Sequence, residues 1–111
     1  MKTLLIVVSV FLFALMFKEP PAQVDFKKGL WAVQYNATFN KKNDYQWKQV
    51  PTMRYHYIDL DKHPKFVKAS NIQYVPTIVI YRNGVKLKRY EADLSLKLIV
   101  NQNEIVRSVQ R

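Results

Sequence analysis

The sequence predicts an α/β domain built on a mixed four-stranded sheet flanked by helices, in the chain order β-α-β-α-β-β-α. Three observations lead to this fold class. Residues 77–81 are almost continuously apolar, which is typical of a central strand covered on both faces. The Asn83-Gly84 pair that follows readily adopts the positive φ angles of a tight hairpin turn. Near the C-terminus, apolar residues recur at the spacing of a helix.

The first half of the domain contains two predicted strands and one predicted helix. Residues 30–35 are rich in aromatic and branched side chains, and residues 53–60 alternate, so both segments are predicted to be strands. Residues 40–49 are predicted to form a short helix. Asn40 would cap this helix by accepting hydrogen bonds from the free N–H groups of its first turn, and Pro51 would end it.

The second half adds a helix, the two arms of the hairpin and a C-terminal helix. Residues 61–70 are predicted to be helical, with Pro64 in the first turn, where its missing N–H has no cost. Residues 85–90 form an edge strand whose lysines discourage unwanted pairing. Residues 95–110 form the clearest helix, and its apolar stripe consists of Leu98, Ile99, Gln102, Ile105, Val106 and Val109. The crossovers before the hairpin are expected to join parallel strands.

The chain divides into an N-terminal apolar segment (residues 1–17), a linker (residues 18–27) and the α/β domain (residues 28–111). Residues 4–17 are apolar except for Ser9. This run is shorter than the roughly 20 residues of a usual membrane span and fits the roughly 7–15 residues of a signal-peptide core. No Ala-x-Ala cleavage pattern follows it. Two interpretations therefore remain: a single-pass membrane anchor with the domain outside the cytoplasm, or the cleaved signal of a secreted or periplasmic protein.

Charge and composition limit the chemistry of the chain. The formal net charge is +10, which favours acidic partners, anionic surfaces or nucleic acid through long-range attraction. Nucleic acid is not expected, because the aromatic-glycine signature of the RNA-recognition module is absent. The sequence has no cysteine, which excludes disulfides, zinc–thiolate sites and cysteine nucleophiles. His56 and His63 have no accompanying ligand pattern, so no catalytic residue, metal site or cofactor is predicted.

Four short motifs follow one another along the domain. They are Tyr-Asn-Ala-Thr-Phe at residues 35–39, Ile-Asp-x-Asp-x-x-Pro at residues 58–64, Val-Pro-Thr at residues 75–77 and Asn-Gly at residues 83–84. The chain resembles the thioredoxin family over about residues 28–110, as a minimal thioredoxin-like fold. The resemblance implies a cis peptide bond before Pro76. It also implies that the family's first strand and first helix are missing and that the helix after the first strand is short.

The resemblance fails at the residues that carry the family's chemistry. Asn40 and Asn43 stand where thioredoxins have their two cysteines. Gln34 replaces the family's buried acid, and Tyr57 replaces its lysine partner. A thiolate is the nucleophile of thiol–disulfide exchange, and an amide cannot replace it. The chain is therefore expected to be redox-inactive and not an enzyme, and a disulfide oxidoreductase role would require cysteines supplied by a partner.

The predicted binding site lies where the loop after the first strand meets the loop before the third strand. In the family, the backbone of the residue before the cis proline, here Val75, pairs with a bound chain as an added strand. This binding needs no thiol, so an extended peptide or a partner protein is the expected ligand. The predicted binding residues are Phe39, Asn40, Lys41, Asn43, Tyr74, Val75 and Pro76.

Two further patterns lie beside this site. Lys41 and Lys42 fall at the start of the predicted helix 40–49, where free N–H groups bind anions, so an anionic ligand or surface is an alternative partner. The other interpretation of these lysines is a pair of exposed side chains in a loop. Asn36-Ala37-Thr38 is an acceptor sequence for N-glycosylation in a eukaryotic secretory pathway.

Overall fold

The computed structural model describes residues 28–109. The predicted N-terminal apolar segment (residues 1–17) and the linker (residues 18–27) lie outside the described residues. The elements are β1 (Leu30–Asn36), the 3-10 helix η2 (Thr38–Asn43), β2 (Arg54–Asp59), α2 (Lys65–Ala69), β3 (Thr77–Arg82), β4 (Val85–Glu91) and α3 (Gln102–Val109). Among the described residues, no helix is long and apolar enough to cross a membrane.

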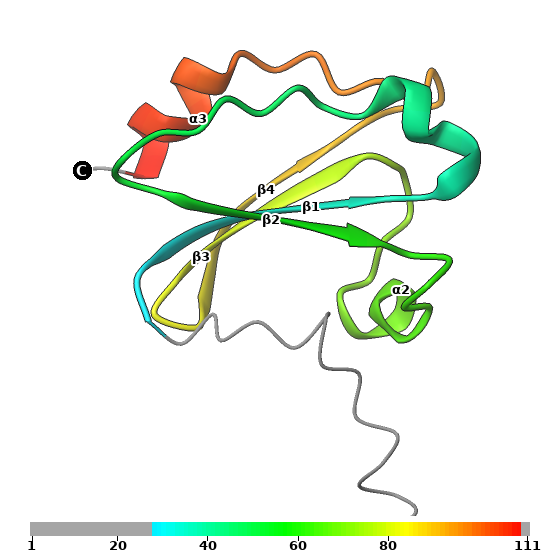
Figure 1. Ribbon diagram of the computed structural model, residues 1–111, viewed down its shortest axis with the longest axis horizontal. Helices are drawn as coiled ribbons and strands as arrows, with labels where there is room; N and C mark the ends of the chain where they lie inside the picture. The colour runs from blue at the N-terminus through cyan, green and yellow to red at the C-terminus, as the bar shows by residue number, and fades with distance from the viewer. Residues whose placement is uncertain (1–27, 110–111) are drawn as a thin grey trace, which may run out of the picture.

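The strands form one mixed sheet in the spatial order β2-β1-β3-β4, as Figure 1 shows. This arrangement confirms the predicted four-stranded sheet. β1 and β2 are parallel, but β3 is antiparallel to β1 and to β4. The expectation that both early crossovers join parallel strands is therefore wrong for the third strand. Helix α2 has only five residues, so the chain does not return along the sheet before it enters β3.

The hairpin between β3 and β4 has the predicted turn. Asn83 and Gly84 have φ angles of 50° and 87°, which are the left-handed conformations that an Asn-Gly turn supplies. The turn is tied to the start of β1, because the Asn83 N–H donates to the Gly29 carbonyl at 2.9 Å. The Gly29 N–H donates in return to Asn83 Oδ1 at 2.9 Å.

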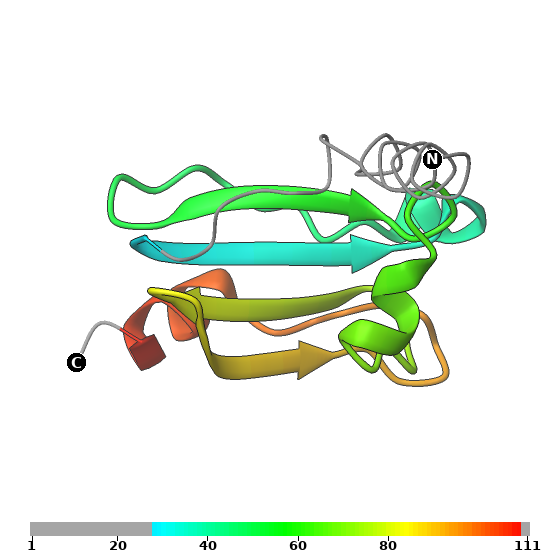
Figure 2. The ribbon, with the colours of Figure 1, turned by 90° about the horizontal axis from the view of Figure 1, so that it is seen from below.

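The core lies on both faces of the sheet. One face carries a buried cluster centred on Val33, Tyr35, Ile58, Val79 and Tyr81, and α2 adds Phe66. The opposite face carries Ala32, Ile78 and Ile80, and α3 adds Ile105 and Val109. Figure 2 shows that α2 and η2 lie at the same end of the sheet, where β1 and β2 finish. This end of the sheet therefore holds the loops of the predicted binding site.

The predicted helix at residues 40–49 is wrong beyond its first turn. The chain forms the 3-10 helix η2 and then continues without a helix through residues 44–49. The Gln34 side-chain amide makes two hydrogen bonds to the Tyr45 backbone. Its oxygen accepts from the Tyr45 N–H at 2.7 Å, and its nitrogen donates to the Tyr45 carbonyl at 3.0 Å. Gln102 holds the Lys48 N–H and carbonyl in the same way, at 2.8 and 2.6 Å. These two amides satisfy backbone groups that a helix would have paired internally.

The two other predicted helices are shorter than expected. Helix α3 begins at Gln102 rather than near residue 95. Leu96 has a φ angle of 62°, which is not helical. Asn101 caps the helix, because its Oδ1 accepts from the Asn103 N–H at 2.8 Å. Ile99, which was expected in the apolar stripe, is 91 % exposed. Helix α2 covers only the last part of the predicted helix 61–70. The residues before it form a turn, in which the His63 N–H donates to the Asp59 carbonyl at 3.0 Å.

Candidate functional site

The loop after β1 and the loop before β3 meet at one end of the sheet. Because β1 and β3 are antiparallel, with Tyr35 opposite Thr77, the end of one strand lies beside the start of the other. The Val75–Pro76 peptide bond is cis. Asn40 joins the two loops directly, because its Nδ2 lies 3.2 Å from the Val75 carbonyl oxygen. The structure thus brings together the two segments that carry the predicted binding residues.

Asn40 is buried between the loops rather than presented to a ligand. Its side chain is 1 % exposed, and its Nδ2 also lies 3.1 Å from Asn36 Oδ1 and 3.0 Å from the Leu96 carbonyl oxygen. Asn43 donates to the Asn40 Oδ1 at 2.8 Å. The prediction that Asn40 caps a helix is therefore wrong, since Asn40 lies inside η2 and connects η2 to the Val75 loop.

The predicted binding residues divide by exposure. Phe39 is 70 % exposed and Lys41 is exposed, so both can contact a ligand. Tyr74 is half-buried, and Val75 is 9 % exposed. Pro76 is buried, as Asn40 is. The side chains open to a ligand therefore come from the rim of the site, while its centre consists of packed groups.

A second polar cluster surrounds Gln34 and Tyr57, where the sequence resemblance places a buried acid and its lysine partner. Gln34 is fully buried, and its Nε2 donates to the Tyr55 hydroxyl at 2.7 Å. Asp44 accepts from Asn36 Nδ2 at 2.6 Å and from the Tyr57 hydroxyl at 2.7 Å. Burial, followed by the hydrogen bond to the Asp44 carboxylate and its negative charge, raises the pKa of Tyr57 well above its usual value. Tyr57 therefore remains a neutral donor at any physiological pH.

Asp44 is a member of this cluster that sequence reasoning missed. It directly follows Asn43, and no motif marks it. The one signal in the sequence was its position directly after the segment that forms η2. Because residues 44–49 are not helical, an acid at that position can lie close to residues 34 and 57. The Asp44 carboxylate holds the Asn36 and Tyr57 side chains in place through its two hydrogen bonds.

An apolar groove opens beside the two loops. It has a volume of about 440 Å³. Its walls come from the loop after β1, from the β2–α2 connection with α2, and from the loop before β3. The lining residues are Ala37, Phe39, Leu60, Asp61, Pro64, Val67, Ile72, Gln73, Tyr74, Val75 and Leu96. Three of the predicted binding residues, Phe39, Tyr74 and Val75, therefore line one concave surface.

The polar groups at this groove are few, and only some of them are paired. Asp61 accepts from the Thr38 N–H at 2.7 Å, and the Thr38 backbone and side chain together lower the pKa of Asp61. The Val75 carbonyl accepts from Asn40 at 3.2 Å. By contrast, the Val75 N–H donates to no group within residues 28–109. The same holds for the N–H groups of Gln73 and Tyr74, so among the described residues the loop before β3 offers several unpaired backbone donors beside an apolar surface.

Metal binding and glycosylation find no support among the described residues. Within residues 28–109, no group of three His, Asp or Glu side chains is arranged to hold a metal ion. Asn36 is fully buried, and its Nδ2 donates to the Asn40 carbonyl at 3.1 Å as well as to Asp44. The nitrogen that a glycan would need is therefore not accessible in the folded domain.

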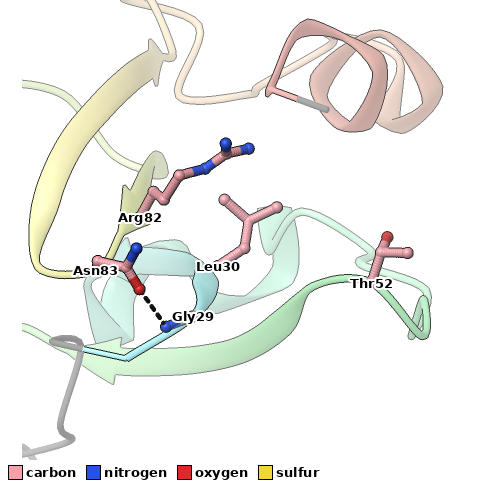
Figure 3. Close-up of a pocket in the computed structure, with 5 residues that line it drawn as sticks. All are labelled: Gly29, Leu30, Thr52, Arg82 and Asn83. Atoms are coloured by element: carbon pink, nitrogen blue, oxygen red, sulfur yellow. Dashed lines mark hydrogen bonds between the residues drawn. The ribbon is translucent and has the colours of Figure 1, made fainter. Parts of the chain in front are cut away.

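A separate hollow lies at the opposite end of the sheet (Figure 3). It has a volume of about 580 Å³ and is lined by Gly29, Leu30, Thr52, Arg82 and Asn83. The guanidinium of Arg82 donates to the Val109 carbonyl, so it secures the end of α3. None of the predicted binding residues lies here, and the lining contains no carboxylate or histidine that could act as a general acid or base.

Comparison with solved structures assigns the fold. No family model matches the chain. Oxidised thioredoxin from Plasmodium falciparum superimposes with a TM-score of 0.55 at 16 % identity, covering 82 % of this chain and 95 % of that one. Another P. falciparum thioredoxin gives 0.53 at 26 % identity, covering 75 % and 70 %. Thioredoxin from Fasciola hepatica gives 0.52 at 16 % identity, covering 77 % and 83 %.

The fold and the sequence together define the class of the protein. The chain has the thioredoxin-like α/β fold, with the mixed sheet in the order β2-β1-β3-β4. It is a cysteine-free example of that fold. The chain itself therefore has no group that can form or break a disulfide.

Proposed function

We propose that this protein is a redox-inactive binding module that holds an extended peptide, or an extended segment of a partner protein, in the groove beside the Val75 loop. The groove of about 440 Å³ carries the proposal, because exposed and half-buried apolar side chains line it. Phe39, which is 70 % exposed, forms its rim. An exposed aromatic side chain next to an apolar hollow is typical of an interaction site.

The backbone of Val75 supports a particular mode of binding. Its N–H donates to no group among the described residues, so it is available to a peptide carbonyl. The Val75 carbonyl already accepts from Asn40, but a carbonyl oxygen has a second lone pair. A bound chain would pair with Val75 as an added strand, and alternate side chains would enter the groove. This pairing needs no thiol, so the protein would act as a binder and not as an enzyme.

The proposal includes attachment to a membrane or secretion. The apolar residues 4–17 lie outside the described residues, and their composition supports either a membrane anchor or a signal peptide. The proposed arrangement is a single-pass anchor with the domain outside the cytoplasm. Protease protection in sealed vesicles tests this arrangement. Protection of the domain on the cytoplasmic side of the membrane would contradict it.

A peptide titration tests the binding proposal. The full chain in a mild detergent is titrated into a fluorescein-labelled decapeptide with a central Leu-Phe-Leu core and Ser/Gln flanks, and fluorescence anisotropy is measured. Phe39→Ser should weaken binding by about tenfold, because an exposed aromatic anchor contributes strongly to a small interface. Val85→Ser is the matched control, since Val85 is 62 % exposed on β4, outside the groove lining. Equal affinities of the two variants would reject the groove as the binding site.

A further inference from the structure

We infer that the domain lies with one end of its sheet against the phosphate headgroups of acidic membrane lipids; this inference rests on the proposed membrane attachment and not on peptide binding. The end in question, called the turn end, is where β1, β2 and β4 begin and β3 finishes in the Asn83-Gly84 turn. The groove lies at the opposite end of the sheet, beside α2 and η2 (Figure 2).

The strand register places basic side chains at the turn end. Arg54 of β2 and Lys86 of β4 occupy the two edges of one row, because both are in register with the Trp31–Tyr81 pair of β1 and β3. Arg82 ends β3 in the next row. All three basic residues are exposed. The turn end thus carries bases on three of its four strands.

These bases have no acidic partner among the described residues. A fourth base, Lys28, is exposed and precedes Gly29, whose N–H donates to the β3–β4 turn at 2.9 Å. Arg54 lies 5.6 Å from the centroid of an aromatic ring, and Arg82 donates to a backbone carbonyl, so both contact neutral groups. None of the four forms an ion pair within residues 28–109. Their charge therefore faces solvent.

The acids of residues 28–109 do not cancel this charge. Glu104 shares α3 with Arg107, so that helix has no net charge. The linker, residues 18–27, contains two lysines and two acids and adds none either. The other described acids belong to the groove end: Asp59 and Glu91 end β2 and β4, Asp61 and Asp93 follow these strands, and Asp44 binds Asn36 at the end of β1.

The shape of the turn end suits a phosphate group. The hollow of about 580 Å³ lies here, and Arg82 contributes its side chain to the lining, which contains no carboxylate (Figure 3). One guanidinium nitrogen donates to the Val109 carbonyl, and the other N–H groups of Arg82 make no hydrogen bond within residues 28–109. A guanidinium with open donors matches the oxygens of a phosphate.

The path of the chain brings this end to the membrane. The chain enters the described domain at Lys28, directly before β1, and the apolar segment ends ten linker residues earlier, at residue 17. Ten residues span at most about 35 Å when fully extended. Attraction between exposed charges and acidic headgroups falls off within about 8 Å at physiological salt, so the end beside the linker gains most from it. The groove would then point away from the membrane and stay open to a peptide.

Fluorescence quenching tests which end of the domain touches the membrane. Because the chain has no cysteine, Val85→Cys and Leu94→Cys each provide a single attachment site for a bimane fluorophore. Val85 is 62 % exposed at the turn end, and Leu94 is 85 % exposed after β4, at the groove end. Each labelled full chain is reconstituted into vesicles of phosphatidylcholine, or of phosphatidylcholine and phosphatidylglycerol in equal parts. Both vesicles contain a lipid with a spin-labelled headgroup, which quenches a fluorophore near the surface.

The label at residue 85 should be quenched about twofold more strongly in the acidic vesicles than in the neutral ones, because acidic lipid attracts the turn end. This difference should shrink as salt screens the charges. The label at residue 94 should be quenched little in either vesicle. Equal quenching of the two labels, or equal quenching of the residue-85 label in the two vesicles, would overturn the inference.

Two double variants separate the turn end from the overall charge of the protein. Lys28→Gln/Lys86→Gln should remove most of the difference between the vesicles. Lys62→Gln/Lys68→Gln removes the same charge from the groove end and should preserve it. Equal losses in the two variants would mean that net charge alone attracts the protein, and the inference would be wrong.

Two further outcomes identify other causes. If inorganic phosphate, exchanged for chloride at the same ionic strength, abolishes the difference, the hollow binds free phosphate and the membrane inference is wrong. If the full chain does not float with the vesicles at all, the proposed membrane attachment fails together with this inference. Peptide binding in the groove is unaffected by either result, because its titration uses the chain in detergent.

Discussion

The two loops that meet at the candidate site differ in what they have kept of the thioredoxin pattern. The loop before β3 keeps the Val-Pro-Thr sequence and a cis peptide bond at Val75–Pro76. The loop after β1 has Asn40 and Asn43 where the sequence resemblance places the two cysteines of thioredoxins. One loop is therefore distinguished by its backbone geometry, while the other is distinguished by hydrogen-bonding amide side chains.

This difference shows that the two parts of the site can change independently. A thiolate has to reach its substrate, whereas the Asn40 amide is buried and binds the Val75 and Leu96 carbonyl oxygens. The loop after β1 has thus become a support that fixes the loop before β3. Stability and binding should consequently depend on different residues, with buried amides important for stability and rim residues important for binding.

The largest effect on stability is expected from Asn40→Ala. The substitution leaves the Val75 and Leu96 carbonyls and the Asn36 side chain without their common donor. Buried polar groups that lose their partner are costly, so the free energy of unfolding should fall by about 2–4 kcal/mol. Equilibrium denaturation in urea measures this change.

Asn43→Ala is the matched control for this prediction. Asn43 is half-buried and makes one hydrogen bond with its side chain, to Asn40, so its removal should cost about 1 kcal/mol or less. Equal losses for the two alanine variants would show that Asn40 does not have the special supporting role that its contacts indicate.

A smaller loss is expected from Gln34→Leu. Leucine has a similar size but cannot bind the Tyr45 backbone or the Tyr55 hydroxyl, so unfolding should become easier by about 2 kcal/mol. Gln102→Leu is the control, because Gln102 binds the Lys48 backbone at a more exposed position and should cost under about 1 kcal/mol. Hydrogen exchange at the Tyr45 amide should accelerate only in the Gln34 variant, and unchanged exchange there would contradict the role assigned to Gln34.

The sheet was predictable because its signals are local and mutually consistent. The apolar run of β3 and the Asn83-Gly84 turn each specify their structure with few neighbours. The segment at residues 40–49 was not predictable in this way. Its extended path depends on Gln34 and Gln102, which lie far away in sequence and replace the backbone partners of a helix. Local propensity contains no information about such long-range amide contacts.

The candidate site was predictable in part for the same reason. The convergence of the loops follows from the strand order, and Phe39 and Tyr74 line the groove. The sequence did not reveal that Asn40 would turn inward, because the choice between capping a helix and bridging two loops depends on the Val75 and Leu96 carbonyls. Asp44 was missed because its partners Asn36 and Tyr57 come from two different strands.

The smallest expected effect is a pH-dependent one at Tyr57, which tests the cluster around Asp44. The pKa of Tyr57 is raised in the folded chain, mainly by burial and then by Asp44, from an ordinary value of 10.0. The unfolded chain therefore releases this proton at lower pH than the folded chain. The contribution of Tyr57 to stability is complete below pH 10 and is lost as the pH rises through and above that value.

Between pH 8 and pH 11, the stability advantage of the wild type over Tyr57→Phe should shrink by up to about 1 kcal/mol. Urea denaturation at the two pH values measures this change. A wild-type advantage over Tyr57→Phe that stays constant with pH would mean that Asp44 does not hold the Tyr57 proton in the folded protein.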